Sequence, residues 1–150
     1  MIINGKSLLR SKPLEPMLDS KQREHGVSYG LGEAGYDVRI KQGVWLNTRK
    51  RFTLASTVER FTMPDHLVGI VHDKSTWARK GLSVFNTVIE PGWEGYLTLE
   101  LVYHGDGELV IPAGAGIAQI LFHALLEDAS YGDGKYQGQP DQPVEAKFEG

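Results

Sequence analysis

The residue whose type and position most clearly allow chemistry is Glu100, an acidic side chain within the alternating run YLTLELV. In an extended strand, the three leucines of this run share one face, which is the face expected to pack into a core. Glu100 shares the other face with Thr98, beside a tyrosine and a valine. A half-exposed charged residue is the commoner outcome for a glutamate in such a strand. The alternative is a carboxylate that lines a pocket and acts as a general base.

A second stretch with chemical potential is HDKSTWARKG, which runs from His72 to Gly81. Asp73 or Ser75 can cap a short helical turn that contains residues 77–80. Backbone N–H groups, hydroxyls and two cations would then gather near the start of this turn, and such a group of donors suits a phosphate. The side chains concerned are Lys74, Ser75, Thr76 and Arg79. A capped turn with solvated charges explains the same residues and is the commoner arrangement.

Two glycine-rich stretches complete the candidates. GKYQGQ, residues 134–139, places a lysine, a tyrosine and a glutamine between glycines, which suits a segment that closes over a ligand. Its composition alone favours a disordered polar tail. GLGEAG, residues 30–35, matches G-x-G-x-x-G, but a dinucleotide site needs a strand before this motif and a helix after it. Here a polar segment precedes it and a strand follows, so we interpret it as a flexible loop.

Composition excludes several classes of site. The chain has no cysteine, which excludes disulfides, a thiol nucleophile and cysteine-ligated zinc, and fits a cytoplasmic protein. None of its five histidines begins an H-x-E, so the signature of the zinc nucleobase deaminases is missing, and no metal site is predicted. A formal charge of −3 predicts neither a nucleic-acid nor a membrane surface. The N-terminal residues contain no apolar run typical of a secretory signal or a membrane span.

The strands that would position these residues begin at residue 36. In YDVRIK, Tyr36, Val38 and Ile40 alternate with polar residues, which is the period of a half-buried strand. Further short strand candidates are RFTLAST, HLVGIVH, LSVFNTVI, YLTLELVYH, ELVIP and GIAQILFHAL. The last of these also allows a helix, but its β-rich neighbours favour a strand. Turn signals such as MPD, EPGWEG, HGDGE and PAGAG separate several of them. Many short strands with such turns predict a mainly β barrel or sandwich with short helical segments.

Outside these strands, the sequence predicts one short helix and two irregular segments. The helix lies around GKSLLRS, and Pro13 and Pro16 end it. Residues 19–35 are polar and rich in glycine, which predicts an irregular arm. The polar tail, residues 127–150, is expected to be mobile. The length of 150 residues predicts a single domain.

Four stretches, in this order along the chain, resemble the dCTP deaminase family, which shares a trimeric β fold with the dUTPases. GYDVRI is similar to an early strand motif of the family, and KSTWAR is similar to its R-S-S-L-A-R motif. IEPGWEGYLTLEL resembles the I-D-P-G-W motif and the strand after it, which ends in a catalytic glutamate. GKYQGQ resembles the C-terminal lid motif. The resemblance implies a dUTPase-like β-barrel or distorted jelly roll, with residues 127–150 as the lid of a single domain.

The resemblance also implies roles for particular residues. Glu100 falls on the catalytic glutamate, and Ser75 and Arg79 fall on residues that help to hold the nucleophilic water and the substrate. The substrate-binding positions implied by the motifs are Lys74 and Thr76 for the phosphates, Glu90 and Trp93 beside the deoxyribose, and Tyr131, Lys135 and Gln139 in the tail.

The activity implied by the resemblance is hydrolytic, zinc-independent deamination of dCTP to dUTP and ammonia. The enzyme would be a homotrimer with shared active sites, and Mg²⁺ would bind through the substrate triphosphate. The alternatives are a bifunctional enzyme that releases dUMP, a dUTPase, and a non-catalytic nucleotide-binding regulatory trimer. Two departures concern specificity: Glu90 replaces the family's aspartate, and only ten residues separate Arg79 from Glu90. Glu100, which a dUTPase does not need, favours deamination.

Overall fold

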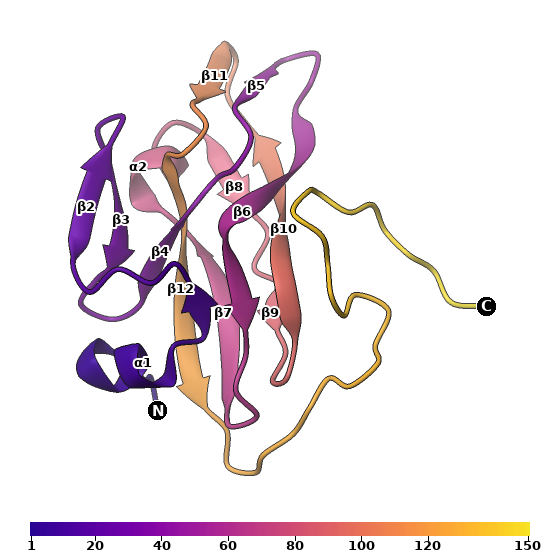
Figure 1. The fold of residues 1–150 in the computed structure, drawn as a ribbon. Helices are drawn as coiled ribbons and strands as arrows, with labels where there is room; N and C mark the ends of the chain where they lie inside the picture. Colours follow the sequence, from indigo (N-terminus) through magenta and orange to yellow (C-terminus); the bar gives the residue numbers. More distant parts are fainter.

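A computed structural model describes residues 1–150 and consists mostly of β-strands (Figure 1). The two helices are short: α1 spans Gly5–Ser11 and α2 spans Ser75–Ala78. No helix is long and apolar enough to cross a membrane. The mainly β fold with short helical segments, and the helix over GKSLLRS, are therefore confirmed.

Three antiparallel sheets make up the fold. The largest has six strands in the order β2 (Lys21–Glu24), β3 (Val27–Leu31), β4 (Tyr36–Arg39), β12 (Gly116–Ala124), β7 (Leu67–Asp73) and β9 (Val88–Ile89). The second has four, in the order β1 (Leu14–Glu15), β6 (Phe52–Thr62), β10 (Glu94–Tyr103) and β8 (Leu82–Val84). The third pairs β11 (Glu108–Ile111) with β5 (Val44–Asn47). The β5 strand was missing from the sequence prediction.

One hydrophobic cluster of 28 buried residues takes side chains from all three sheets. Phe122 and Ile120 of β12 and Leu99 and Leu101 of β10 contribute to it from the two larger sheets. The alternation along β12 explains why GIAQILFHA is a strand: Ile120 and Phe122 are fully buried, whereas the residues between and after them are partly exposed. A period of two cannot match a helical face.

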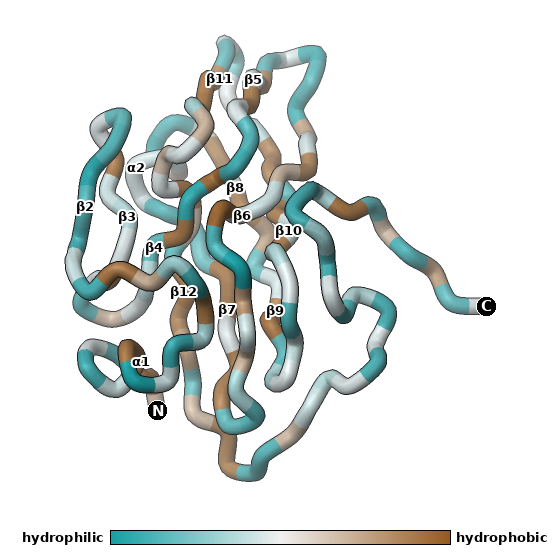
Figure 2. Tube along the Cα trace, viewed as in Figure 1, coloured by the Kyte–Doolittle hydropathy of each residue, from teal (hydrophilic) through white to brown (hydrophobic).

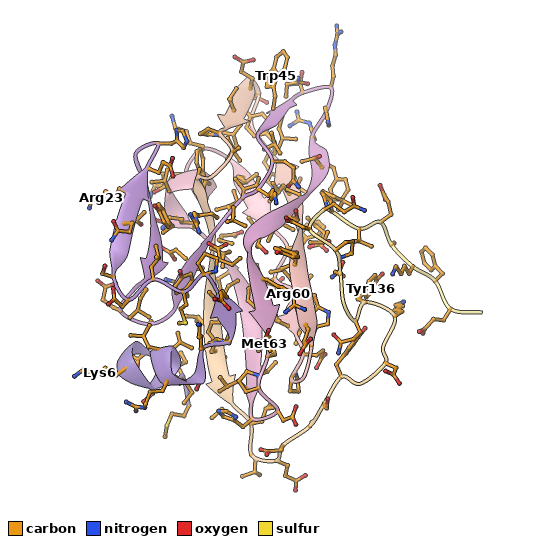
Figure 3. All side chains as sticks on the ribbon, viewed as in Figure 1. Lys6, Arg23, Trp45, Arg60, Met63 and Tyr136 are labelled. Atoms are coloured by element: carbon orange, nitrogen blue, oxygen red, sulfur yellow. The ribbon has the colours of Figure 1, made fainter.

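The expectation of an irregular arm over residues 19–35 was wrong. Most of it forms the β2–β3 hairpin, whose turn at His25 and Gly26 has positive φ angles of 54° and 75°. Such angles give a turn that matches the twist of paired strands. All four residues of β2 are exposed, because β2 is an edge strand, and it is hydrophilic along its length (Figure 2). Arg23 points away from the body of the molecule (Figure 3). Without an apolar face, the strand gave no alternation to detect.

Two smaller expectations were also wrong. LSVFNTVI is not one strand: β8 pairs with β10, and β9 pairs with β7, so this stretch passes from one large sheet to the other. Neither Asp73 nor Ser75 caps α2. Lys74 occupies the N-cap position without a side-chain cap, and Asp73 Oδ1 accepts a hydrogen bond from the Val84 N–H at 2.6 Å. The aspartate thus fixes β8 rather than the helix.

After β12, the chain turns and runs back along β10 (Figure 1). This C-terminal segment, residues 127–150, contacts β10 through an isolated parallel bridge between Gly95 and Gln139. Tyr136 lies on the part of the segment that faces the sheet (Figure 3). The segment is thus placed over one side of the four-stranded sheet. Its mobility as a lid, and the single-domain organisation, stay predictions.

Candidate active site

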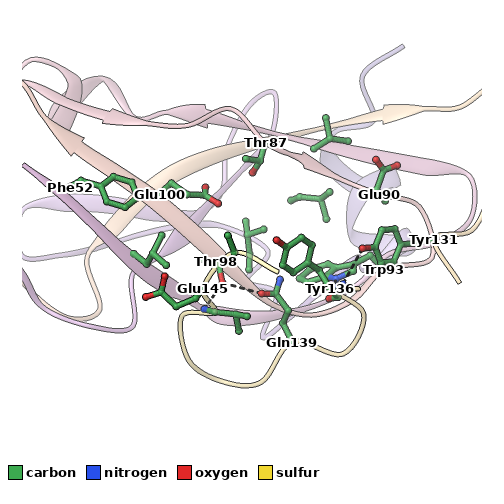
Figure 4. A pocket seen from close by; sticks show the side chains of 16 residues that line it. Phe52, Thr87, Glu90, Trp93, Thr98, Glu100, Tyr131, Tyr136, Gln139 and Glu145 are labelled. Carbon is green, nitrogen blue, oxygen red and sulfur yellow. Dashed lines mark hydrogen bonds between the residues drawn. The ribbon is translucent and has the colours of Figure 1, made fainter. Parts of the chain in front are cut away.

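A pocket of about 470 Å³ lies between β10, the turn that precedes it and the C-terminal segment (Figure 4). Strands β6 and β10 supply Phe52, Leu54, Leu97, Thr98 and Glu100. The β9 region supplies Thr87, Val88, Ile89, Glu90 and Trp93. The C-terminal segment supplies Tyr131, Tyr136, Gln139, Val144, Glu145 and Ala146. Ten of the sixteen lining residues are hydrophobic, so the pocket suits an apolar, planar group flanked by a few polar contacts.

The Glu100 carboxylate is the most unusual polar group in this pocket. Its Oε2 atom is buried and has no hydrogen-bond partner. Burial raises the pKa of Glu100 above its ordinary value, because desolvation disfavours the charged form, and a backbone hydrogen bond offsets only part of this effect. Buried polar atoms without partners are rare in folded proteins. A carboxyl group with a raised pKa and a free oxygen can both accept and return a proton.

The strand β10 holds Glu100 in place through pairing on both sides. Glu100 lies opposite Leu54 of β6, and its carbonyl accepts a hydrogen bond from the Phe85 N–H at 3.1 Å. Leu99 and Leu101 on either side are buried in the core. Because alternate side chains of a strand point to opposite faces, burying the leucines directs Glu100 to the pocket.

The turn before β10 is braced by Trp93. Its indole ring is buried and packs against Phe61, with the ring centroids 6.0 Å apart. Its Nε1–H donates to the carbonyl of Tyr136 at 2.6 Å, and its backbone N–H donates to the carbonyl of Glu90 at 3.2 Å. Glu90 itself is exposed at the rim of the pocket. Trp93 therefore connects the core, the turn and the C-terminal segment.

The C-terminal segment contributes polar contacts on the side of the pocket that faces Thr98. The Thr98 hydroxyl donates to Gln139 Oε1 at 3.1 Å and accepts a hydrogen bond from the Val144 N–H at 3.1 Å. Tyr131 is held by its backbone N–H, which donates to the Pro91 carbonyl at 2.7 Å. Its hydroxyl accepts from the Tyr136 N–H at 3.1 Å. These contacts place Tyr131 and Gln139 in the same pocket as Glu100.

The residues around α2 do not line this pocket. Lys74 Nζ lies 2.6 Å from Asp37 Oδ2 and 2.9 Å from Ser28 Oγ, and its side chain is only 11% exposed. Its charge is therefore already paired within the chain. Ser75, Thr76 and Arg79 are exposed on the surface of the molecule. No group of three or more histidine, aspartate or glutamate side chains is arranged to hold a metal ion.

Comparison with known proteins identifies the family. A model described as "dCTP deaminase-like" matches residues 36–125. A dCTP deaminase of Herpetosiphon aurantiacus is 36% identical over 158 aligned positions, covering 84% of this chain and 86% of the relative. A dCTP deaminase of Campylobacter jejuni strain RM1221 is 35% identical, covering 89% of each chain.

The chain belongs to the dCTP deaminase-like family.

Two solved dUTPase structures share this fold. A dUTPase from phage phi11 of S. aureus has a TM-score of 0.60 at 16% identity, covering 81% of this chain and 95% of that one. The EIAV dUTPase has a TM-score of 0.57 at 17% identity, covering 77% and 92%. The dUTPase-like β fold of this dCTP deaminase-like chain is thereby confirmed.

Within this dCTP deaminase-like chain, the implied site residues divide into two groups. Those that line the pocket are Glu90, Trp93, Glu100, Tyr131 and Gln139. Those that lie outside it are Lys74, Ser75, Thr76, Arg79 and Lys135. Lys135 is exposed, lies 5.3 Å from the centre of the Tyr136 ring and donates to the carbonyl of Lys147 at 2.7 Å. The roles of both groups stay predictions. The residues of the second group do not line the pocket of their own chain.

Several lining residues were not identified from the sequence of this dCTP deaminase-like chain. Thr98 shares the Glu100 face in the alternation of the strand, so that pattern could have revealed it. Phe52, Tyr136 and Glu145 gave no comparable signal, because they come from distant segments that only the folded chain brings together.

Proposed function

We propose that this protein catalyses the hydrolytic deamination of dCTP to dUTP and ammonia. The observation that carries the proposal is the buried, unpartnered carboxylate of Glu100 in a pocket of a dCTP deaminase-like chain. The relatives named as dCTP deaminases, at 35–36% identity over most of their length, support the same activity.

In the proposed reaction, Glu100 removes a proton from a water molecule as the water oxygen attacks C4 of cytosine. The proton that Glu100 accepts passes to N3 of the ring and neutralises the charge that develops there. A second proton transfer from the added hydroxyl group to the exocyclic amine makes it a good leaving group. The C4–N4 bond then breaks, ammonia leaves and C4 becomes a carbonyl. The raised pKa of Glu100 suits this exchange, because it makes the carboxylate a stronger base than an ordinary glutamate and lets the group return the proton it has accepted.

Magnesium enters this proposal with the substrate. All charged side chains that line the pocket are glutamates, namely Glu90, Glu100 and Glu145. A triphosphate that reaches this pocket therefore meets no cation from the lining. Mg²⁺ prefers phosphate oxygens and water, and it supplies compensating charge when it is bound to the triphosphate. Lys135 is the one cation among the implied phosphate contacts of the C-terminal segment, and Gln139 is the implied contact that lines the pocket.

We further propose that the active enzyme is a homotrimer in which a neighbouring copy completes each pocket. Ser75 and Arg79 are exposed and lie outside the pocket of their own chain, so they are free to face another copy. Phe52, Phe85 and Val88 leave about half of their surface exposed around the pocket mouth, and apolar groups of this kind are commonly covered in an assembly. The cytoplasmic location expected from the sequence stays a prediction.

The test is to incubate the purified protein with magnesium and dCTP, and separately with dUTP, and to measure ammonia and pyrophosphate. Ammonia alone, from dCTP, is the expected result. Both products from dCTP would identify the bifunctional enzyme, for which Glu90 at the rim of the same pocket is the candidate second carboxylate. Pyrophosphate from dUTP alone, or neither product, would refute the proposed activity.

A further inference from the structure

The strand that carries Glu100 has an open edge at its start, and the C-terminal segment fills it. Strand β6 pairs with one edge of β10 from Glu94 onward, whereas β8 pairs with the other edge only from Leu101 to Tyr103. On the free part of that edge, the Gly138 N–H donates to the Glu94 carbonyl at 2.9 Å. The Tyr96 N–H donates to the Gln139 carbonyl at 3.1 Å. The segment thus pairs with β10 in parallel orientation at one isolated bridge, between Gly95 and Gln139.

Gly95 permits this close approach. Its φ angle is +138°, and a Cβ atom built on it would lie 2.6 Å from the backbone nitrogen of Gln139. A side chain at this position would therefore collide with the backbone of the added segment, which cannot rotate away as a flexible side chain could. The place where the segment docks is built into β10 itself.

The side chain of Gln137 ties the docked segment to the turn. Its Oε1 accepts hydrogen bonds from the Glu94 N–H at 2.7 Å and the Gly138 N–H at 3.2 Å. Its Nε2 donates to the carbonyls of Gly92 at 3.0 Å and Gly132 at 2.9 Å. One amide has two donor hydrogens and two acceptor positions, so the hydrogen-bonding capacity of Gln137 is fully used. A single side chain thereby joins the turn and β10 to Gly132 and Gly138 of the segment.

Gln137 does not line the pocket, but the residues on both sides of it do. Tyr136 and Gln139 are lining residues, and Gln139 contacts the Thr98 hydroxyl on the strand that carries Glu100. We propose that Gln137 is a positioning residue, a clasp that holds the C-terminal segment on the edge of β10 and so sets Tyr136 and Gln139 in the substrate pocket. Its effect on catalysis rests on the proposed deamination, whereas its effect on the segment does not.

Hydrogen exchange on the free protein tests the clasp without any substrate. The amides of Tyr96 and Gly138 report directly on docking, because both donate across the edge between β10 and the segment. In Gln137→Ala, we expect these two amides to exchange about tenfold faster, as expected when a few part-exposed hydrogen bonds are lost. Gln142→Ala is the matched control, because Gln142 lies in the same segment, is exposed and makes no side-chain hydrogen bond. Unchanged exchange in Gln137→Ala would overturn the clasp.

Steady-state kinetics test the positioning role. If the docked state binds substrate, the KM for dCTP in Gln137→Ala rises by the factor by which the docked fraction falls, up to about tenfold, while kcat changes less than about twofold. Glu100 keeps its place in β10, so the chemical step is preserved. An unchanged KM in a variant whose Tyr96 and Gly138 amides have lost most of their protection, or a fall in kcat alone, would overturn the positioning role.

Gly95→Ala provides a second route to the same state, because its added methyl group displaces the segment by steric contact. It should raise the exchange rate of the Gly138 amide and the KM in the same direction as Gln137→Ala. If the unmodified protein releases no ammonia from dCTP, the proposed function fails, and the exchange rates still decide whether Gln137 holds the segment.

Discussion

Replacing Glu100 by glutamine separates the effect of this residue on the stability of the fold from its proposed role in catalysis. The carboxylate has one buried oxygen without a partner, and burial raises its pKa. Glutamine has nearly the same shape and is neutral at all pH values, so it removes the unfavourable buried charge. It also removes the proposed general base. We therefore expect Glu100→Gln to be more stable than the unmodified protein at neutral pH and almost inactive.

The size of the stability gain follows from the surroundings of the side chain. An unsatisfied buried polar group costs about 1–3 kcal/mol, and more for a full charge. Glu100 is only partly buried, and glutamine keeps an unpartnered polar group, so the net gain is placed at the low end, about 1 kcal/mol. For a chain of this length, that corresponds to a rise of about 2–4 °C in Tm. Loss of a general base lowers the rate of deamination by about 10²–10⁴-fold.

The gain should depend on pH in a defined direction. The raised pKa means that the folded protein holds the Glu100 proton more tightly than the unfolded chain does. Stability of the unmodified protein therefore falls as pH rises from the ordinary value of 4.5 through the raised folded value, and the loss is complete above it. The difference between Glu100→Gln and the unmodified protein should be smallest below pH 4.5, where both side chains are neutral, and largest above the raised folded pKa of Glu100.

Thermal unfolding of both proteins at equal concentration, across this pH range, measures the difference, and contributions from all other titrating groups cancel. Ammonia release measured on the same samples gives the catalytic effect. A variant that is less stable at neutral pH, or a difference that does not shrink on acidification, would show that Glu100 is not a desolvated carboxylate. Deamination at the unmodified rate would refute its role as the base.

Three further changes test other parts of the reasoning. Lys74→Met should lower the free energy of unfolding by about 3 kcal/mol, since it leaves Asp37, which is 5% exposed, as an unpaired buried charge. Glu59→Gln should lower it by less, about 1 kcal/mol, because Glu59 is 0% exposed and pairs with Arg39 at 2.9 Å, but burial raises the pKa of Glu59 and so offsets part of this attraction; urea unfolding measures both. If each site of the trimer takes Glu100 from one subunit and Arg79 from a neighbour, one site in four of a random mixture of Arg79→Ala and Glu100→Gln subunits receives both intact residues. Such a mixture should therefore restore about a quarter of the unmodified activity.

The two stability predictions have matched controls. Lys80→Met removes an exposed lysine just beyond α2 and should leave stability unchanged, and Glu94→Gln breaks an exposed ion pair with Arg60 at 3.5 Å and should cost less than about 1 kcal/mol. A raised KM with normal stability in Lys74→Met would show that its charge serves the substrate and not Asp37. Activity no higher in the mixture than in either variant alone would contradict the shared site.

The β architecture was largely readable from local patterns. Period-two alternation identified β4 and β10, because a strand that buries one face must place apolar residues at every second position. The β12 run also allowed a helix, and its β-rich neighbours decided for a strand. The hairpin over residues 21–31 was missed because its sequence does not show this alternation. Its edge strand buries nothing, so its residues carry no such pattern, and only pairing with β3 and the left-handed turn at His25 and Gly26 define it.

The sequence by itself determined which side of β10 carries Glu100, and its motifs indicated the family. Only the tertiary structure decided what surrounds that carboxylate. Lys74 was predicted to face a phosphate, but a residue 37 positions earlier in the chain pairs with its charge. The C-terminal segment was predicted to be mobile and polar, yet an open strand edge, a glycine without a side chain and one glutamine place it beside the pocket. Periodicity depends on neighbours in sequence, whereas desolvation and ion pairing depend on neighbours in space.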